Sequence, residues 1–138
     1  MPKAYDIMTQ GVMTISRDAK ISEAIKTMIE RRITSLIVES DGLYGIVTRK
    51  DIVNKVVAHR RDPDKVKVKE IMSEPLMVIP PDMEMEDIAL LMAKTDVRRF
   101  AVMGDNGLIG LVSNSDILRA YALESGKQPL PIEIKMEK

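Results

Sequence analysis

The stretch Gly-Ile-Val-Thr-Arg-Lys-Asp at Gly45–Asp51 returns as Gly-Leu-Val-Ser-Asn-Ser-Asp at Gly110–Asp116. Around these two heptads, residues 6–56 align with residues 70–121, with one inserted residue, Asn106, in the second copy. A long period in only two copies indicates two supersecondary units packed on each other rather than a solenoid. We therefore expect a cleft between the copies, where small molecules usually bind. The identical pairs outside the heptads include Met8/Met72, Met13/Met77, Asp18/Asp82, Met28/Met92 and Val38/Val102.

Each copy predicts the same order of elements, β-α-β-β-α. A short extended piece, VMTI or LMVI, precedes an amphipathic helix, for which Asp18 and Asp82 are the predicted N-caps. Two β-branched runs around a turn then predict a hairpin. A second helix follows, capped by Thr48 or Ser113. The apolar run at residues 36–38 is typical of a strand buried on both faces.

These patterns predict an α+β fold in which two β-α-β-β-α repeats pack through their sheets with pseudo-two-fold symmetry. One copy alone buries too little apolar surface to be stable, which favours packing of the two. We expect repeat 1 at residues 4–60 and repeat 2 at residues 70–124. Residues 61–69 are expected to form a polar linker, and residues 125–138 an extended C-terminal tail.

Composition excludes several classes of function. The chain has 21 Lys plus Arg and 21 Asp plus Glu, so no net field attracts nucleic acid or anionic lipid. Zero cysteines exclude thiol catalysis and thiolate zinc sites and agree with a cytoplasmic location. The single histidine, His59, lies in a charged stretch with nothing nearby to complete a catalytic pair. We expect no enzyme activity, no metal site, and no nucleic acid or membrane as partner.

The heptads suit two roles. A strand that ends in Thr or Ser and turns into a helix leaves free amides at the helix N-terminus, which favour anions. The hydroxyl adds a donor, and an Asp one turn later can accept hydrogen bonds from vicinal hydroxyls, so the set suits a ribose phosphate. The alternative is structural: Thr48 with Asp51, and Ser113 with Asp116, are also serviceable capping boxes.

With the heptads placed before the last helix of each repeat, residues 4–123 resemble the CBS-domain family, specifically the tandem pair called a Bateman module. Each heptad matches the family's Gly-hydrophobic-x-Thr/Ser-x-x-Asp signature. The resemblance implies a regulatory, ligand-sensing module that binds an adenine nucleotide or nucleoside between the repeats. AMP, ADP, ATP and S-adenosylmethionine are the expected ligands, and no cofactor is expected.

The resemblance also implies two pockets. In the first, the Asp takes the ribose, and Ser, Thr and basic residues take the phosphates. Its residues are Met13, Thr34, Ser35, Lys50, Val97, Arg98, Leu111, Ser113, Asn114, Ser115 and Asp116. The mirror pocket takes Ile33, Thr34, Ile46, Thr48, Arg49, Lys50, Asp51, Met77, Arg98 and Arg99.

The two pockets differ in residues that affect binding. Ser35 leaves room for a base in the first pocket, where the second has the bulky Arg99. Lys50 reaches toward the first pocket, whereas its counterpart is Ser115. The pocket of Asp116 is therefore expected to fill first. Arg98 is either a phosphate ligand or a solvated edge residue, and the nearby methionines are expected as adaptable core residues.

A second class of function stays open, a structural or dimerisation module with no small-molecule ligand. In either class we expect a homodimer, because Ile52–Val57 and Ile117–Leu123 carry more apolar residues than one globule covers. The chain has no effector domain of its own, so an effector protein is a further expected partner.

Overall fold

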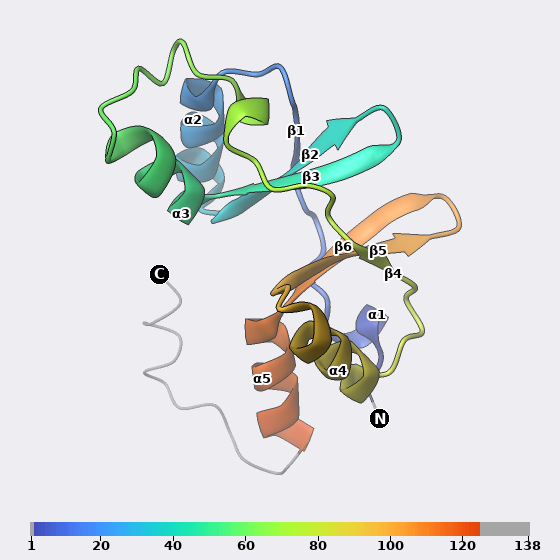
Figure 1. Ribbon diagram of the computed structural model, residues 1–138. Coiled ribbons are helices and arrows are strands. Elements are labelled where there is room, and N and C mark those ends of the chain that lie inside the picture. Colours follow the sequence, from blue (N-terminus) through green and yellow to red (C-terminus); the bar gives the residue numbers. More distant parts are fainter. Residues whose placement is uncertain (1, 125–138) are drawn as a thin grey trace. The chain divides into compact units, whose positions relative to one another are not determined.

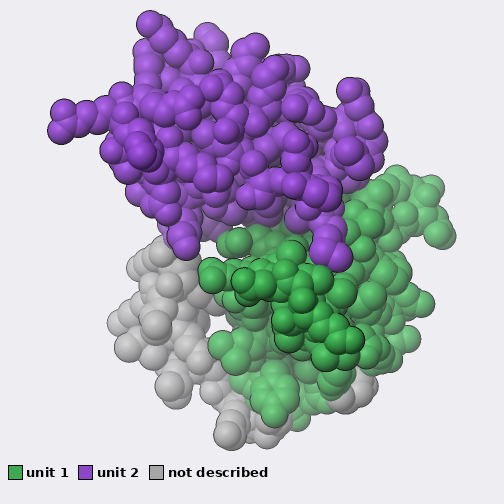
Figure 2. Space-filling view, in the orientation of Figure 1, with its two compact units in different colours: residues 1–11, 78–138 green, residues 12–77 purple. Residues whose placement is uncertain are grey.

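The computed structural model describes residues 2–124, and the chain divides into two compact units (Figure 2). Unit 1 consists of residues 1–11 and 78–138, and unit 2 consists of residues 12–77. Each unit contains one three-stranded sheet. The described part therefore has the mixed α+β character and the doubled architecture that the sequence predicts.

Unit 2 follows the predicted β-α-β-β-α order (Figure 1). Strand β1 pairs in parallel with β2, and β2 pairs antiparallel with β3 across a tight turn at Asp41 and Gly42. Both turn residues have positive φ, 37° and 83°, which Asp and Gly tolerate. The elements are β1 (Thr14–Ser16), α2 (Ile21–Arg31), β2 (Ser35–Ser40), β3 (Leu43–Thr48), α3 (Arg49–Ile52), the π-helix η1 (Val53–Val57) and the 3₁₀ helix η2 (Val68–Glu70).

Unit 1 repeats this arrangement with strand order β4-β5-β6. The hairpin of β5 and β6 changes register between Val102 and Met103, which accommodates the residue inserted at Asn106. The elements are α1 (Ala4–Ile7), β4 (Val78–Ile79), α4 (Met85–Thr95), β5 (Arg99–Gly104), β6 (Gly107–Ser113) and α5 (Asn114–Glu124).

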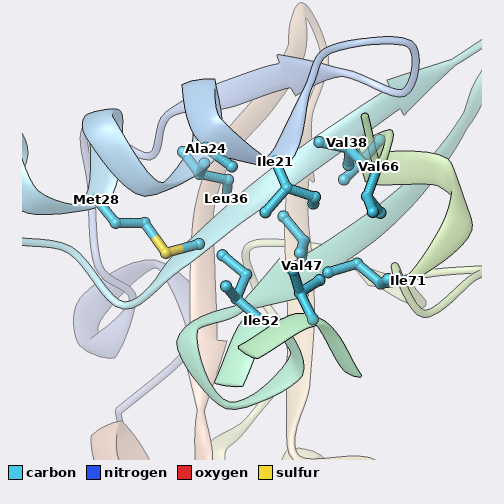
Figure 3. Packing of buried hydrophobic residues seen from close by; sticks show 11 residues of the cluster. Ile21, Ala24, Met28, Leu36, Val38, Val47, Ile52, Val66 and Ile71 are labelled. Carbon is cyan, nitrogen blue, oxygen red and sulfur yellow. The ribbon is translucent and has the colours of Figure 1, made fainter. Parts of the chain in front are cut away.

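The core of unit 2 forms between its helices and one face of its sheet (Figures 1 and 3). Leu36 and Val38 lie on that face, and Ile21 and Met28 of α2 pack against it. Ile37 points to the opposite face, because side chains alternate along a strand, and it too is buried. The strand is therefore buried on both faces, as predicted. The cluster comprises Ile21, Ala24, Met28, Leu36, Val38, Val47, Ile52, Val56, Val66, Val68 and Ile71.

The compact units are not the linear repeats of the sequence. Ser73, near the start of the second sequence repeat, pairs with Ile46 of unit 2 through two backbone hydrogen bonds of 2.9 Å. Thr9, at the equivalent place in the first repeat, pairs with Leu111 of unit 1 through hydrogen bonds of 2.8 and 3.1 Å. The opening segment of each sequence repeat thus packs on the last strand of the other repeat.

This exchange of segments explains the glycine that opens each heptad. A Cβ at Gly45 would lie 3.0 Å from the Ser73 carbonyl oxygen, and one at Gly110 would lie 3.0 Å from the Thr9 carbonyl oxygen. Such contacts are tighter than nine in ten real Cβ contacts, so the crossing segment favours glycine at both positions.

The expected polar linker takes part in the core. Val66 and Val68 are 4% and 0% exposed and belong to the hydrophobic cluster of unit 2. The charged residues around these valines are exposed, which is why the composition of residues 61–69 suggests a linker. The expected C-terminal tail, residues 125–138, lies outside the described residues.

The predicted N-caps Asp18 and Asp82 are wrong. Helices α2 and α4 begin after Lys20 and Glu84, and neither residue makes a side-chain cap. Backbone carbonyls of neighbouring segments satisfy the first amides instead: Ile21 donates to Val66 at 2.9 Å, and Met85 donates to Pro2 at 2.9 Å. A capping side chain is unnecessary where another segment supplies the acceptors.

Candidate functional site

The heptad of unit 2 turns from β3 into α3 through a complete capping box. Asp51 donates its amide to Thr48 Oγ1 at 3.1 Å, and its Oδ2 accepts from both the amide and the hydroxyl of Thr48 at 2.9 Å. The other oxygen, Oδ1, forms an ion pair of 3.5 Å with Lys55. Lys55 also donates to the carbonyl of Ile71 at 2.8 Å.

The heptad of unit 1 repeats the box. Asp116 donates its amide to Ser113 Oγ at 3.3 Å, and its Oδ2 accepts from the Ser113 amide at 2.8 Å and hydroxyl at 3.0 Å. Its Oδ1 accepts from Arg119 at 3.2 Å and from the Thr9 hydroxyl at 3.5 Å. Asp116 is a buried carboxylate, with 9% of its surface exposed.

Residues just before the middle strand lie against each heptad. Arg49 donates its amide to the Thr34 carbonyl at 2.9 Å, and Ser35 is the strand partner of Thr48. In unit 1, Asn114 donates to the Arg98 carbonyl at 3.0 Å. Arg99 is the strand partner of Ser113 there. Each unit therefore brings the predicted residues of its own two segments together.

Two of the first three helix amides are already hydrogen-bonded in each unit. In α3 these are the amides of Arg49 and Asp51, and in α5 those of Asn114 and Asp116. The helix N-terminus consequently offers fewer free donors to an anion than the sequence suggests. A phosphate at this place would depend more on exposed side chains such as Lys50 and Arg98.

The predicted pocket residues are distributed over both units. Unit 2 contains Met13, Ile33, Thr34, Ser35, Ile46, Thr48, Arg49, Lys50, Asp51 and Met77, and unit 1 contains Val97, Arg98, Arg99, Leu111, Ser113, Asn114, Ser115 and Asp116. Each predicted pocket combines residues of the two units, and both pockets stay predictions. Within unit 2, Met13 joins the sheet, since its carbonyl accepts from the Ile37 amide at 3.0 Å.

Lys55, Arg119 and Thr9 contact the heptad carboxylates and were not predicted from the sequence. A signal for the two basic residues was present, because they follow their aspartates by four and three positions, the spacing of helical ion pairs. Nothing in the local pattern indicates Thr9, which reaches Asp116 from the far end of the chain.

A separate open hollow of about 630 Å³ lies within unit 1, away from the heptad residues. Its lining includes Lys3, Tyr5, Pro80, Asp82 and Asp105. In the described residues, no group of three or more His, Cys, Asp or Glu could hold a metal ion. None of the helices in residues 2–124 has the length and apolar character of a membrane span.

Comparison with known proteins identifies the class. The CBS-domain family model matches residues 4–58 and 68–123, so the chain belongs to the CBS-domain family and carries two such domains in tandem. Proteins built from these domains are typically regulatory, non-catalytic modules.

Individual relatives agree with this assignment. The CBS domain-containing protein YhcV of Bacillus subtilis is 34% identical over 118 residues, which cover 85% of this chain and 84% of that protein. An uncharacterized protein of Methanopyrus kandleri, MK0525, is 36% identical, and the matched part spans 60% of its length.

Solved structures also agree. A hexameric CBS-CP12 protein from bloom-forming cyanobacteria is similar with a TM-score of 0.81 and 40% identity, covering 98% of this chain and 76% of that one. Hypoxic Response Protein I, solved with two coordinated zinc ions, is similar with a TM-score of 0.68 and 28% identity, covering 87% of this chain and 99% of that one.

Proposed function

We propose that this CBS-domain pair is a regulatory sensor that binds an adenine nucleotide or nucleoside, such as AMP, ADP, ATP or S-adenosylmethionine. The observation that supports the proposal most is the duplicated cluster around the motif aspartates. In each unit, the Asp, the Thr or Ser that caps its helix, and the residues before the middle strand are linked by backbone and side-chain hydrogen bonds.

The chemistry of each cluster suits a ribose with a phosphate attached. An ionised carboxylate accepts hydrogen bonds and so pairs with the two hydroxyls of a ribose. Lys50 and Arg98 lie beside the caps, are exposed, and carry the positive charge that a phosphate requires. The ligand-bound state of the module would then change the activity of an effector protein that contacts it.

We also propose self-association. The helix α5 exposes Leu118, Tyr121 and Leu123, and the π-helix η1 exposes Val53 and Val57. Apolar side chains grouped on one element are typical of protein contacts. The similar cyanobacterial CBS-CP12 protein is described as hexameric, which supports assembly of copies, and a homodimer is the smallest symmetric form. Light scattering that shows a monomer at micromolar concentration would contradict this.

The alternative function is a structural or dimerisation module with no small-molecule ligand. The complete capping boxes favour it, because they give Thr48, Asp51, Ser113 and Asp116 a structural role that needs no ligand.

Ligand-induced stabilisation separates the two functions. A ligand that binds the folded state alone raises the melting temperature in a saturable way. We expect AMP to raise the melting temperature of the unaltered chain. In the double variant Asp51→Ala/Asp116→Ala, AMP should no longer raise it. The matched control is Asp62→Ala/Asp64→Ala, which changes charge equally in the loop before η2. Equal AMP responses in both double variants would leave the aspartates as helix caps only.

A further inference from the structure

The two motif aspartates hold the same capping box but differ in how their remaining oxygen is used. Asp51 and Asp116 each commit Oδ2 to the amide and hydroxyl of the preceding cap residue. A ligand with two vicinal hydroxyls therefore has to donate its hydrogen bonds mainly to Oδ1. The occupancy of Oδ1 consequently decides which site is open.

In unit 1, Oδ1 of Asp116 is contacted by two donors. It accepts a charge-assisted hydrogen bond from Arg119 at 3.2 Å and a longer one from the Thr9 hydroxyl at 3.5 Å. A carboxylate oxygen has two lone-pair directions, so Arg119 takes one acceptor position of Oδ1, and the long Thr9 contact holds the other only weakly. The Asp116 side chain is also 10% exposed, which leaves little surface for a ligand.

In unit 2, Oδ1 of Asp51 is only loosely held. Within the described residues the structure places Lys55 near it, at 3.5 Å, a distance typical of an ion pair rather than a short hydrogen bond. The Lys55 ammonium donates to the carbonyl of Ile71 at the shorter distance of 2.8 Å. The Asp51 side chain is 17% exposed.

We infer that Arg119 is a positioning residue that closes the Asp116 site to a ribose, and that the Asp51 site binds the nucleoside first. This inference rests on the proposed function and adds to it which of the two sites responds. The order is the reverse of the one that the sequence predicts from Ser35, Lys50 and Arg99. The difference comes from the residues that contact Oδ1 rather than from the residues expected to surround the base.

The test isolates each site and uses adenosine, which has the diol but no phosphate. In the Asp51→Ala background only the Asp116 site remains, and Arg119→Met removes its competing donor while keeping a side chain of similar length. Isothermal titration should show adenosine binding roughly 3- to 10-fold tighter than with Arg119 present. Arg119→Lys keeps a positively charged donor, so its adenosine affinity should lie between those of the Arg119 and Arg119→Met forms. In the Asp116→Ala background, Lys55→Met should give a smaller gain.

Two controls separate the inference from other roles of Arg119. A dideoxyadenosine without the ribose 2′- and 3′-hydroxyls does not need Oδ1, so its weaker binding should not respond to Arg119→Met. Lys94→Met removes a positive charge from α4 in the same unit and should leave adenosine affinity unchanged.

Three results would overturn the inference. Unchanged or weaker adenosine binding in Arg119→Met would show that Arg119 does not close the site. Unchanged adenosine binding with weaker AMP binding would make Arg119 a phosphate ligand instead. If neither adenosine nor AMP binds to the unaltered chain or to any variant, the proposed function is wrong and the inference falls with it. The first two results differ from this one because a ligand still binds.

Discussion

Unit 2 and unit 1 carry the same heptad pattern, but the helices after it differ. In unit 2, α3 ends at Ile52 and continues as the π-helix Val53–Val57, with Ala58 donating to the Val53 carbonyl at 2.9 Å. In unit 1, α5 runs as one α-helix from Asn114 to Glu124. The basic residue that pairs with the motif aspartate also differs in position: Lys55 follows Asp51 by four residues, and Arg119 follows Asp116 by three.

This difference shows that one sequence motif can hold carboxylates whose Oδ1 atoms have different partners. The capping box is the same in both units because it depends only on residues inside the heptad. The partners of the other oxygen, Oδ1, come from the next helical turn and, in unit 1, from Thr9 near the start of the described chain. π-Helical turns often occur at functional sites, which agrees with the more open carboxylate lying in unit 2.

The largest expected effect compares one buried strand residue from each unit. Phe100 aligns with Leu36, and both are almost fully buried, at 0% and 1% exposed. Phe100→Ala should lower the free energy of unfolding by about 3–5 kcal/mol and Leu36→Ala by about 2–5 kcal/mol. Chemical denaturation followed by circular dichroism measures both. Leu90→Ala, which changes an exposed side chain of α4, is the control, and a similar loss there would contradict the burial of Phe100 and Leu36 as the cause.

The next effect tests the crossing segments. Gly45→Ala and Gly110→Ala place a methyl group against the carbonyls of Ser73 and Thr9, so each should destabilise its unit by about 1–3 kcal/mol. Gly104→Ala is the matched control, because its nearest neighbours are the Ile109 methyl groups at 3.4 Å. Thermal melts compare the three variants. Equal stabilities would mean that the opening segments do not pack on the last strands.

A comparable or smaller effect tests whether residues 61–69 belong to unit 2. Val68→Ala removes a fully buried side chain from its core and should cost roughly 1.5–3 kcal/mol. The neighbouring change Lys65→Ala removes an exposed side chain and should stay within about 0.5 kcal/mol of the unaltered chain. If both variants unfold alike in denaturant titrations, the segment is a linker after all.

The smallest effect is acid sensitivity in unit 2. The pKa of Glu70 is lowered from its ordinary 4.5, first by the hydrogen bond from the Lys67 backbone and then by Arg61. A lowered folded-state pKa stabilises the protein above pH 4.5, and this contribution is lost as the pH falls through the folded pKa. Glu70→Gln should therefore flatten the acid side of the stability profile slightly. An unchanged profile would show that this carboxylate does not affect stability.

The duplicated fold could be predicted from the sequence because its signals are local. The heptads, the Asp41-Gly42 turn and the apolar run at Leu36–Val38 each specify their own element. The family assignment follows from the same residues. The helix starts predicted from Asp18 and Asp82 are wrong, because backbone carbonyls of distant segments, rather than capping side chains, accept hydrogen bonds from the first helix amides.

The rest could not be read from local pattern. The pairing of Thr9 with Leu111 and of Ser73 with Ile46 joins residues far apart in the chain. Val66 and Val68 are two apolar residues in a charged stretch, too few to announce a core segment. The spacing of Lys55 and Arg119 can be read from the sequence, but their distances from Oδ1 cannot.

One measurement tests the central claim most directly, that the motif aspartates bind the ribose and that Asp51 is the open one. A crystal structure of the chain with limiting AMP should show the nucleotide with its ribose hydroxyls on the Asp51 carboxylate. The Asp116 carboxylate should keep its hydrogen bond from Arg119. Ribose density on Asp116 alone, or nucleotide density away from both aspartates, would contradict the account.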